Sequence, residues 1–240
     1  MIVIPMVGLS SRFFKKGYTK PKYMLTLNEK SVFEHSVSSF SYYFKTLPFL
    51  FIVRSDFDTP AFVEQEVKQM GIADYRIIVL NTETKGQAET VFMGLSRIDY
   101  SGDITIFNID TFRPDFRLPA YEKDGFVEVF KGEGDNWSYA KPIDGSTLIA
   151  EMAEKNRISD LCCTGLYHFS STELFFDAYQ QQLKTPATQW QAGELYVAPL
   201  YNFLLSKGYK FSYNLIDSKD VIFCGIPEEY EQLKVDQRFM

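Results

Sequence analysis

The sequence has little of what zinc proteins, membrane proteins and nucleic-acid-binding proteins need. Its 240 residues include three Cys and two His, without a Cys-x-x-Cys pair or a Cys/His spacing typical of a metal site. Met1 leads directly into Ile-Val-Ile-Pro and no long apolar run follows, so we expect neither a signal peptide nor membrane insertion. The net charge of −6 argues against binding of nucleic acid. Free thiols suit a reducing compartment, and we expect a cytoplasmic protein.

What the chain does have is apolar and aromatic residues in regular alternation. Hydrophobic residues make up 45% of the chain, with 22 Phe and 15 Tyr, which predicts a Phe-rich core. Short apolar runs at 2–6, 49–53, 76–80 and 103–108 predict strands, and helical spacing follows a Ser31–Glu34 capping box, Thr59-Pro60 and Ala88. This alternation predicts an α/β fold with a parallel sheet covered on both faces. Ligands of such sheets bind beyond the carboxyl ends of the strands.

The second half of the sequence is less regular. We expect strands at 125–130, 137–142, 163–169 and 209–216, a helix after a Ser170–Glu173 capping box, a helix over 194–206 and a last helix from Pro227. Nothing resembles a linker or a repeat, so we expect one domain over residues 1–240. A sub-domain seam is expected near Arg113-Pro114.

A loop with small residues follows the first strand. Gly8-Leu9-Ser10-Ser11-Arg12 is a turn whose backbone N–H groups can approach phosphate oxygens, and Arg12 can add a charged contact. Lys22, in Lys20-Pro21-Lys22, could bring a point charge to the same phosphates. A solvated basic loop would read the same way. The loop is neither a dinucleotide-binding nor a P-loop motif.

A strand followed by G-x-S-S-R and K-P-K resembles the sugar-phosphate and choline-phosphate nucleotidyltransferase family. The resemblance implies a single-domain Rossmann-like (GT-A-like) fold with a mixed, mostly parallel central sheet flanked by helices. It implies a nucleotide-binding half over residues 1–112 and an acceptor-binding half over 113–240. It assigns the NTP phosphates to Gly8, Leu9, Ser10, Ser11, Arg12 and Lys22, although many members have Gly at the position of Ser10.

Later motifs match the family in the expected order. The resemblance implies base and ribose contacts from Lys85, Gly86, Gln87 and Ala88, and a metal-binding carboxylate at Asp110 after the fourth strand. It implies acceptor contacts from Lys155, Thr164, Gly165 and Glu194, with Asn156 in place of the usual Pro. Arg12, Lys22 and Asp110 are the implied catalytic residues.

The second metal carboxylate departs from the common pattern. Many members have an Asp where this chain has Phe223, whereas the choline-phosphate branch has an acidic residue at the end of the preceding strand. Asp217 fits the second pattern, with Asp220 in reserve. The implied cofactor is Mg²⁺, which prefers carboxylate and phosphate oxygens.

The implied reaction transfers NMP from an NTP to a small phosphorylated acceptor and releases pyrophosphate. CTP is slightly favoured by the placement of Asp217, with UTP or dTTP as alternatives. The acceptor is a sugar 1-phosphate, a polyol phosphate or phosphocholine, and surface polysaccharide biosynthesis is the expected purpose. A GT-A glycosyltransferase and a non-catalytic nucleotide-binding domain are the alternatives. The oligomeric state is left open.

Two features are interpreted as structural. Asp56-Phe57-Asp58 spells the D-x-D motif of glycosyltransferases, but its place before Thr59-Pro60 favours a helix-entry loop. His35 and His168 lie far apart in the sequence, and we expect both to pack rather than to catalyse.

Overall fold

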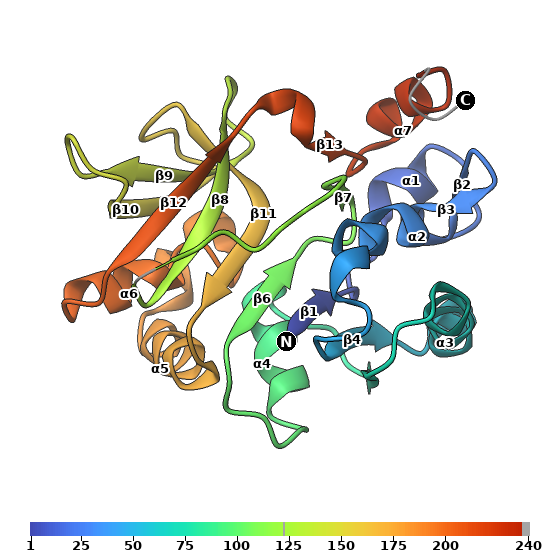
Figure 1. The fold of residues 1–240 in the computed structure, drawn as a ribbon, viewed down its shortest axis with the longest axis horizontal. Coiled ribbons are helices and arrows are strands. Elements are labelled where there is room, and N and C mark those ends of the chain that lie inside the picture. The colour runs from blue at the N-terminus through green and yellow to red at the C-terminus, as the bar shows by residue number, and fades with distance from the viewer. Residues whose placement is uncertain (122, 237–240) are drawn as a thin grey trace. The chain divides into compact units, whose positions relative to one another are not determined.

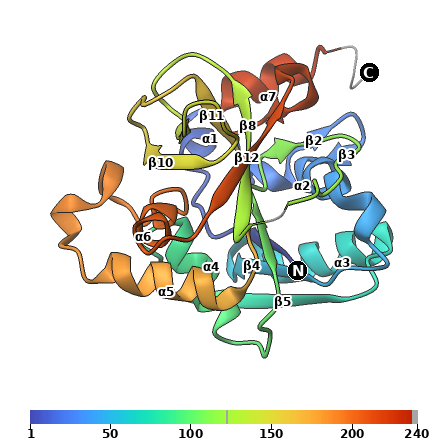
Figure 2. The same ribbon diagram turned by 60° about the vertical axis from the view of Figure 1, so that its left-hand side comes forward.

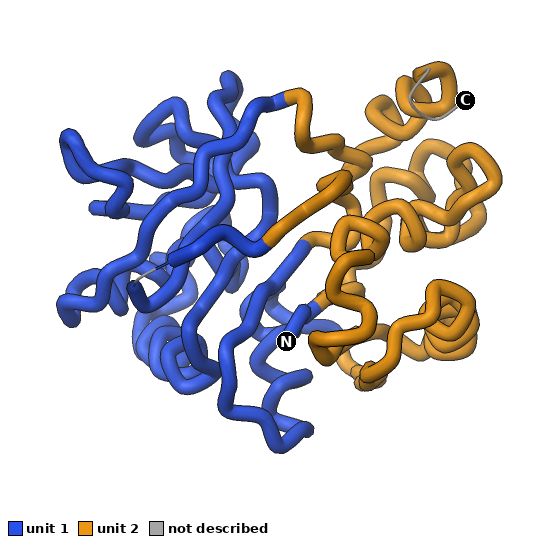
Figure 3. The backbone as a smooth tube through the Cα atoms, viewed as in Figure 1, with its two compact units in different colours: residues 1–3, 83–107, 118–218 blue, residues 4–82, 108–117, 219–240 orange. Residues whose placement is uncertain are grey.

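The computed structural model describes residues 1–121 and 123–236. The chain is an α/β protein whose mixed sheet is flanked by helices (Figure 1). Its segments form two compact units (Figure 3). Unit 1 comprises residues 1–3, 83–107 and 118–218, and unit 2 comprises residues 4–82, 108–117 and 219–240. The division into nucleotide- and acceptor-binding halves at residue 112 stays a prediction.

Unit 1 contains most of the sheet. Its strands lie in the order β10-β9-β11-β6-β1, and β8 pairs with both β11 and β12. β12 lies beside β8 and is parallel to it (Figure 2). β1 is parallel to β6, whereas β11 is antiparallel to β6, β8 and β9. The strands are β1 (Ile2–Pro5), β6 (Ile104–Phe107), β8 (Gly125–Lys131), β9 (Ser138–Pro142), β10 (Ile149–Glu154), β11 (Leu161–Phe169) and β12 (Phe211–Ile216).

Three helices of unit 1 pack through aromatic side chains. They are α4 (Gln87–Leu95), α5 (Thr172–Leu183) and α6 (Leu200–Ser206). Phe92 of α4 stacks on Tyr179 of α5 with ring centroids 4.4 Å apart, and Tyr201 of α6 stacks on Phe169 of β11 at 4.5 Å. The burial of these large rings supplies the Phe-rich core that the composition predicts.

Unit 2 contains the end of β1 and the strands β4 and β5. β4 (Phe49–Arg54) and β5 (Tyr75–Leu80) are parallel, and the Met6 N–H donates to the Ile52 carbonyl. Two short antiparallel pairs complete the unit: β2 (Thr26–Leu27) with β3 (Lys30–Ser31), and β7 (Thr111–Phe112) with β13 (Ile222–Phe223). Its helices are α1 (Ser11–Lys15), α2 (Val32–Val37), α3 (Thr59–Met70) and α7 (Pro227–Leu233).

Several predicted elements are confirmed with shifted bounds. Ser31 caps α2 by accepting from the Glu34 N–H, but α2 ends at Val37 and continues as 3-10 turns to Tyr43. The N-cap of α5 is Ser171 rather than Ser170, because the Ser171 hydroxyl accepts from the Leu174 N–H. Strand β10 was not predicted from the sequence. Asp56–Asp58 forms a 3-10 turn directly before α3, so the helix-entry interpretation is confirmed.

The predicted helix over 194–206 is wrong in its first part. α6 begins only at Leu200, and Glu194 is extended with φ −129° and ψ 163°. The Leu195 N–H donates to the Lys85 carbonyl and the Leu195 carbonyl accepts from the Ala88 N–H, both at 2.8 Å. A helix starting at Glu194 would leave the Leu195 carbonyl without a partner, because the residue four positions on is Pro199, which has no N–H and is the N-cap of α6.

No helix among residues 1–121 and 123–236 is both long and apolar enough to cross a membrane. Both histidines pack as expected. The His35 ring lies 5.4 Å from Phe112, and His168 is fully buried with its ring 4.8 Å from Phe126.

Candidate active site

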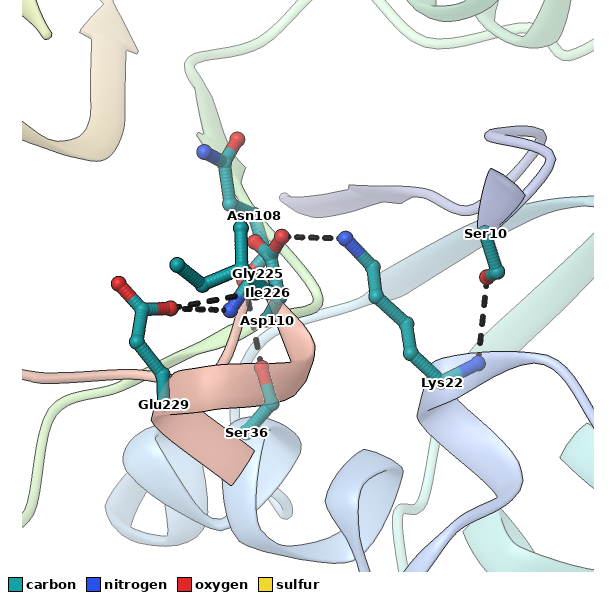
Figure 4. Close-up of polar contacts among 8 residues, drawn as sticks. All are labelled: Ser10, Lys22, Ser36, Asn108, Asp110, Gly225, Ile226 and Glu229. Carbon is teal, nitrogen blue, oxygen red and sulfur yellow. Dashed lines mark hydrogen bonds and ion pairs between the residues drawn. The ribbon is translucent and has the colours of Figure 1, made fainter. Parts of the chain in front are cut away.

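The loop after β1 and the Lys22 segment are joined inside unit 2 by a side chain (Figure 4). The hydroxyl oxygen of Ser10 accepts a hydrogen bond from the Lys22 backbone N–H at 3.1 Å. Ser10 has a φ of 50°, in the left-handed region, directly before α1. A non-glycine residue there costs about 1 kcal/mol or more. The hydrogen bond gives a reason for Ser at a position where many family members have Gly.

Lys22 and Asp110 form an ion pair. The Lys22 ammonium donates to the Asp110 carboxylate, and each side chain keeps 21% of its surface exposed. Asp110 follows β6, as the sequence predicts, and its backbone carbonyl accepts from the Cys224 N–H at 2.8 Å. The antiparallel pair β7–β13 places these two chain segments together. The structure therefore brings together two of the three predicted catalytic residues, 88 positions apart in sequence.

A second carboxylate lies next to Asp110. Glu229 of α7 accepts hydrogen bonds from the N–H groups of Gly225 and Ile226, at 2.7 and 3.2 Å. Burial raises the pKa of the Glu229 carboxyl, and the negative charge of Asp110 raises it further. Glu229 was not a predicted site residue. The pairing of β7 with β13 and the core packing of Tyr230 and Leu233 hold α7 in this part of unit 2. Such contacts are not readable from the sequence, although the acidic pair after Gly225-Ile-Pro was a visible signal.

Gly225 lies directly against these two acids. A Cβ atom at this position would lie 3.1 Å from an Asp110 carboxylate oxygen and 3.7 Å from a Glu229 carboxylate oxygen. Two carboxylates next to the same residue supply oxygen donors of the kind that a hard divalent cation prefers. Within the described residues no group of three His, Cys, Asp or Glu side chains is arranged to hold a metal. Asp110 and Glu229 would thus leave most coordination positions to substrate oxygens or water.

The predicted second metal ligands lie elsewhere along the chain. Asp217 follows β12 in unit 1 and is exposed. Asp220 is exposed in unit 2, and its backbone carbonyl accepts from the Arg113 guanidinium at 2.5 Å. Phe223, where many family members have Asp, pairs with Thr111 in the β7–β13 ladder. Metal binding by Asp217 or Asp220 stays a prediction.

The rest of the predicted phosphate loop is open. Gly8, Leu9, Ser11 and Arg12 are exposed, and a Cβ atom at Gly8 would meet nothing within 4 Å. The loop thus offers accessible backbone N–H groups and one guanidinium, as its predicted role requires.

In unit 1, Lys155 lies in a strained turn at the end of β10. Its φ is 52°, and its N–H donates to the Trp137 carbonyl at 2.8 Å. The Lys155 ammonium donates to the Tyr196 hydroxyl at 2.5 Å and lies 4.7 Å from the centroid of the Tyr196 ring. Its side chain is exposed. Lys155 is thus a charged donor whose partner is neutral, which suits the binding of an anion.

The predicted base-binding loop also lies in unit 1. Lys85, Gly86 and Gln87 are exposed or half-buried, whereas Ala88 is buried in the first turn of α4. The Lys85 N–H donates to the Glu89 carboxylate at 2.5 Å. Gly86 has a φ of 144°, and a Cβ atom there would lie 2.5 Å from the Leu195 carbonyl oxygen. Only glycine fits this position.

The remaining predicted acceptor residues differ in exposure. Glu194 is exposed next to Leu195, whereas Thr164 is buried in β11 and donates to the Glu128 carboxylate at 3.1 Å. Gly165 has a φ of 93°, and the pairing of β11 with β8 shifts register between Cys163 and Tyr167. The role of all three residues in acceptor binding stays a prediction.

Several solved structures are similar to this chain. A nucleoside-diphosphate-sugar pyrophosphorylase from Vibrio cholerae RC9 is 54% identical over 98% of this chain and 100% of its own, with a TM-score of 0.95. A putative glucose-1-phosphate thymidylyltransferase from Bacillus anthracis is 15% identical over 97% of this chain and 93% of its own, with a TM-score of 0.74. The inositol-1-phosphate CTP transferase from T. maritima is 12% identical over 100% of this chain and 97% of its own, with a TM-score of 0.72.

The fold and the charged loops define a nucleotidyltransferase of the GT-A-like type. The identity and coverage shared with the V. cholerae structure show that the chain belongs to the family of nucleoside-diphosphate-sugar pyrophosphorylases, or sugar-phosphate nucleotidyltransferases. The resemblance read from the sequence motifs is thereby confirmed. The structures at 12–15% identity support the fold alone. No protein-family model matches the sequence, and a search of curated proteins finds no match.

Proposed function

We propose that the protein transfers a nucleoside monophosphate from an NTP to a sugar 1-phosphate and releases pyrophosphate. The observation that carries this proposal is the 54% identity, over 98% of the chain, to a nucleoside-diphosphate-sugar pyrophosphorylase. The Lys22–Asp110 pair beside the open loop of residues 8–12 supports it from the geometry. Because that relative is a pyrophosphorylase of nucleoside-diphosphate sugars, we favour a sugar phosphate over a polyol phosphate or phosphocholine as the acceptor.

The reaction forms one P–O bond and breaks another. An oxygen of the acceptor phosphate attacks the α-phosphorus of the NTP in line, and the bond from the α-phosphorus to the bridging oxygen of the β-phosphate breaks. A phosphate monoester has a second pKa near ~6, so the attacking oxygen is already ionised at neutral pH. No general base is required. Both histidines, packed as they are, are therefore not needed for the chemistry.

The protein's contribution is then alignment and charge. Lys22 and Arg12 would bind the phosphates and stabilise the charge on the departing pyrophosphate. Lys155 would hold the acceptor phosphate, and residues 84–88 would contact the base. Asp110 would hold Mg²⁺, with Glu229 as the neighbouring carboxylate and Asp217 as the ligand implied by the family branch. When bound, the ion neutralises phosphate charge and orients the reacting oxygens.

The nucleotide and the pathway are finer proposals. We favour CTP, because Asp217 follows the pattern of the choline-phosphate branch, with UTP and dTTP as alternatives. Surface polysaccharide biosynthesis is the purpose we propose, and the reducing compartment suggested by three buried free thiols makes the cytoplasm its site.

A pyrophosphate-release screen tests the proposal. CTP, UTP, dTTP and GTP are each combined with glucose 1-phosphate, glycerol phosphate or phosphocholine, with Mg²⁺ or EDTA, and the product is identified by mass. We expect a nucleoside-diphosphate sugar, formed only with Mg²⁺. Turnover of an NDP-sugar without pyrophosphate would indicate a glycosyltransferase, and NTP binding without turnover would indicate a non-catalytic domain.

Two variants test the site itself. Lys22→Ala and Asp110→Ala should each lower pyrophosphate release about 100-fold or more, the scale of losing one preorganised charge contact. Lys20→Ala, an exposed cation two residues away, is the matched control. Near-normal rates in both variants would refute the assignment. A Mg²⁺-dependent thermal shift, expected in the wild type and lost in Asp110→Ala, reports the metal independently of activity.

A further inference from the structure

A short segment of unit 1, residues 191–196, contacts two regions that the proposed function assigns to different substrates. One is the nucleotide loop, residues 84–88, and the other is the Glu154-Lys155 turn. The segment includes a 3-10 turn, Gln191–Gly193, and then runs extended through Glu194 and Leu195 instead of starting a helix.

On the nucleotide side the contact is made by backbone. Leu195 exchanges two hydrogen bonds of 2.8 Å with the loop, one to the Lys85 carbonyl and one from the Ala88 N–H. Leu195 is 1% exposed, so its backbone groups have little water to replace these partners. Gly86 lies so close that a Cβ atom would be 2.5 Å from the Leu195 carbonyl oxygen. The loop therefore cannot move without moving Leu195.

On the acceptor side the contact is made by side chains. The Gln191 amide oxygen accepts from the Glu154 N–H at 2.6 Å, and the Tyr196 hydroxyl accepts from the Lys155 ammonium at 2.5 Å. The Tyr196 ring also lies near the ammonium, which is 4.7 Å from its centroid. Burial raises the pKa of Tyr196, so its hydroxyl is neutral and adds no charge next to Lys155, although the carboxylates of Glu154 and Glu194 also act electrostatically on the ammonium.

We propose that Tyr196 is the positioning residue of Lys155, and that Leu195 links the position of this lysine to the nucleotide loop. A long lysine side chain in water loses rotamer entropy when it is fixed. Tyr196 fixes the ammonium before the acceptor arrives, and as a neutral hydrogen-bond partner it adds no negative charge to that of the neighbouring Glu154 and Glu194. Because Leu195 and Tyr196 are adjacent, ordering of the loop by a nucleotide also orders the ammonium. The proposal rests on the proposed function, in which Lys155 binds the acceptor phosphate.

Tyr196→Phe tests the positioning role, because it removes the hydroxyl and keeps the ring. We expect the KM for the acceptor to rise about 10-fold or more, the scale of one hydrogen bond to a charged group, with the KM for the NTP within about twofold. Lys155→Met should raise the acceptor KM further, and adding Tyr196→Phe to Lys155→Met should have no additional effect. Tyr209→Phe, at a partly exposed tyrosine of unit 1, is the matched control.

The link is tested by binding. A non-hydrolysable α,β-methylene NTP should tighten acceptor binding to the wild type about fivefold or more. The acceptor should tighten binding of the NTP analogue by the same factor. In Tyr196→Phe this factor should fall towards one. Any of three results would overturn the proposal. They are an acceptor KM unchanged by Tyr196→Phe, an equal rise in that KM when Tyr196→Phe is added to Lys155→Met, and a coupling factor that Tyr196→Phe leaves unchanged. A wild type that forms no nucleoside-diphosphate sugar with any substrate pair would instead refute the proposed function, and with it the positioning role of Tyr196.

Discussion

The two lysines predicted to bind phosphate, Lys22 in unit 2 and Lys155 in unit 1, have partners of different charge. Lys22 pairs with the Asp110 carboxylate, so the formal charge of that pair is zero. Lys155 donates to the neutral Tyr196 hydroxyl, and the Glu154 and Glu194 carboxylates act on it only electrostatically. The first arrangement suits a site where a cation and an NTP meet, and the second suits capture of an anionic acceptor. The two lysines thus differ in their direct partner, a carboxylate for Lys22 and a hydroxyl for Lys155.

The two units also differ in how their segments are joined. In unit 2 a side chain, Ser10, bonds to the Lys22 backbone. In unit 1 two backbone hydrogen bonds join Leu195 to the loop of residues 84–88, next to a glycine with no room for a Cβ atom. A side-chain link can be removed by mutation with little disturbance, whereas a backbone link can only be displaced. We therefore expect substitutions in unit 1 to have the larger effects.

Among the substitutions that test how the segments are joined, Gly86→Ala should have the largest effect. The new methyl group would overlap the Leu195 backbone, so loop and segment must separate by about 1 Å, a misplacement that costs about 100-fold in rate. Both the NTP KM and the acceptor KM should rise. Gly145→Ala is the matched control in unit 1, because Gly145 also has positive φ, 69°, but has nothing within 4 Å of its would-be Cβ. The measurement is the steady-state kinetics of both variants. If Gly145→Ala lowered the rate as much as Gly86→Ala, backbone strain at a positive φ, and not the link to Leu195, would be responsible.

His168 should make the stability of the protein fall at mildly acid pH. Burial lowers its pKa to about 4, with partial compensation from the charge of Asp103 and a further lowering by the N-terminal ammonium. Its Nδ1 pairs with the Thr105 hydroxyl, whereas its Nε2 has no partner among the described residues, and Tyr121 and Phe126 flank the ring. Protonation therefore favours the unfolded chain.

The stability that neutral His168 contributes is complete above its ordinary pKa of about 6.5 and is lost as the pH falls towards 4. Between pH 7 and pH 5 we expect a loss of about 2 kcal/mol in the free energy of unfolding, measured by urea denaturation. His168→Gln should flatten this dependence. His35→Gln in unit 2, where the histidine is half-buried, should change it less. An unchanged slope in His168→Gln would contradict the assignment.

Ser10 substitutions should have the smallest effect and separate two contributions. Ser10→Ala removes the bond to Lys22 and keeps the left-handed backbone strain, whereas Ser10→Gly removes both. We expect Ser10→Ala to lower kcat/KM for the NTP about 5–10-fold, in line with one lost hydrogen bond, without changing the acceptor KM. Ser10→Gly should be equally impaired but more stable in thermal unfolding than Ser10→Ala. A normal NTP KM in Ser10→Ala would show that the bond does not position Lys22.

Much of the fold was predictable, because strand and helix periods are local properties of the sequence. Asp110 was predictable as well, since it directly follows a buried strand whose carboxyl end points to the ligand edge of an α/β sheet. The start of α6 was predicted wrongly because the apolar spacing from Leu195 to Leu204 suits a helix, whereas Pro199 has no N–H and caps a helix that begins only at Leu200. Pro199 was a visible signal, but the bonds of the Leu195 backbone to residues far away in sequence were not.

The sequence by itself determined the family, the order of the elements and the loop residues that distinguish a nucleotidyltransferase. Glycine, lysine and strand-end aspartate at these spacings indicate the family. The backbone freedom of glycine and the charges of lysine and aspartate are intrinsic to the residue types and can therefore be recognised in the sequence. Only the tertiary structure decided the partners: Glu229 beside Asp110, Ser10 on Lys22 and Tyr196 on Lys155. The physical reason is that a partner depends on which segments the sheet brings within hydrogen-bond distance, and these segments lie from 12 to more than 100 residues apart.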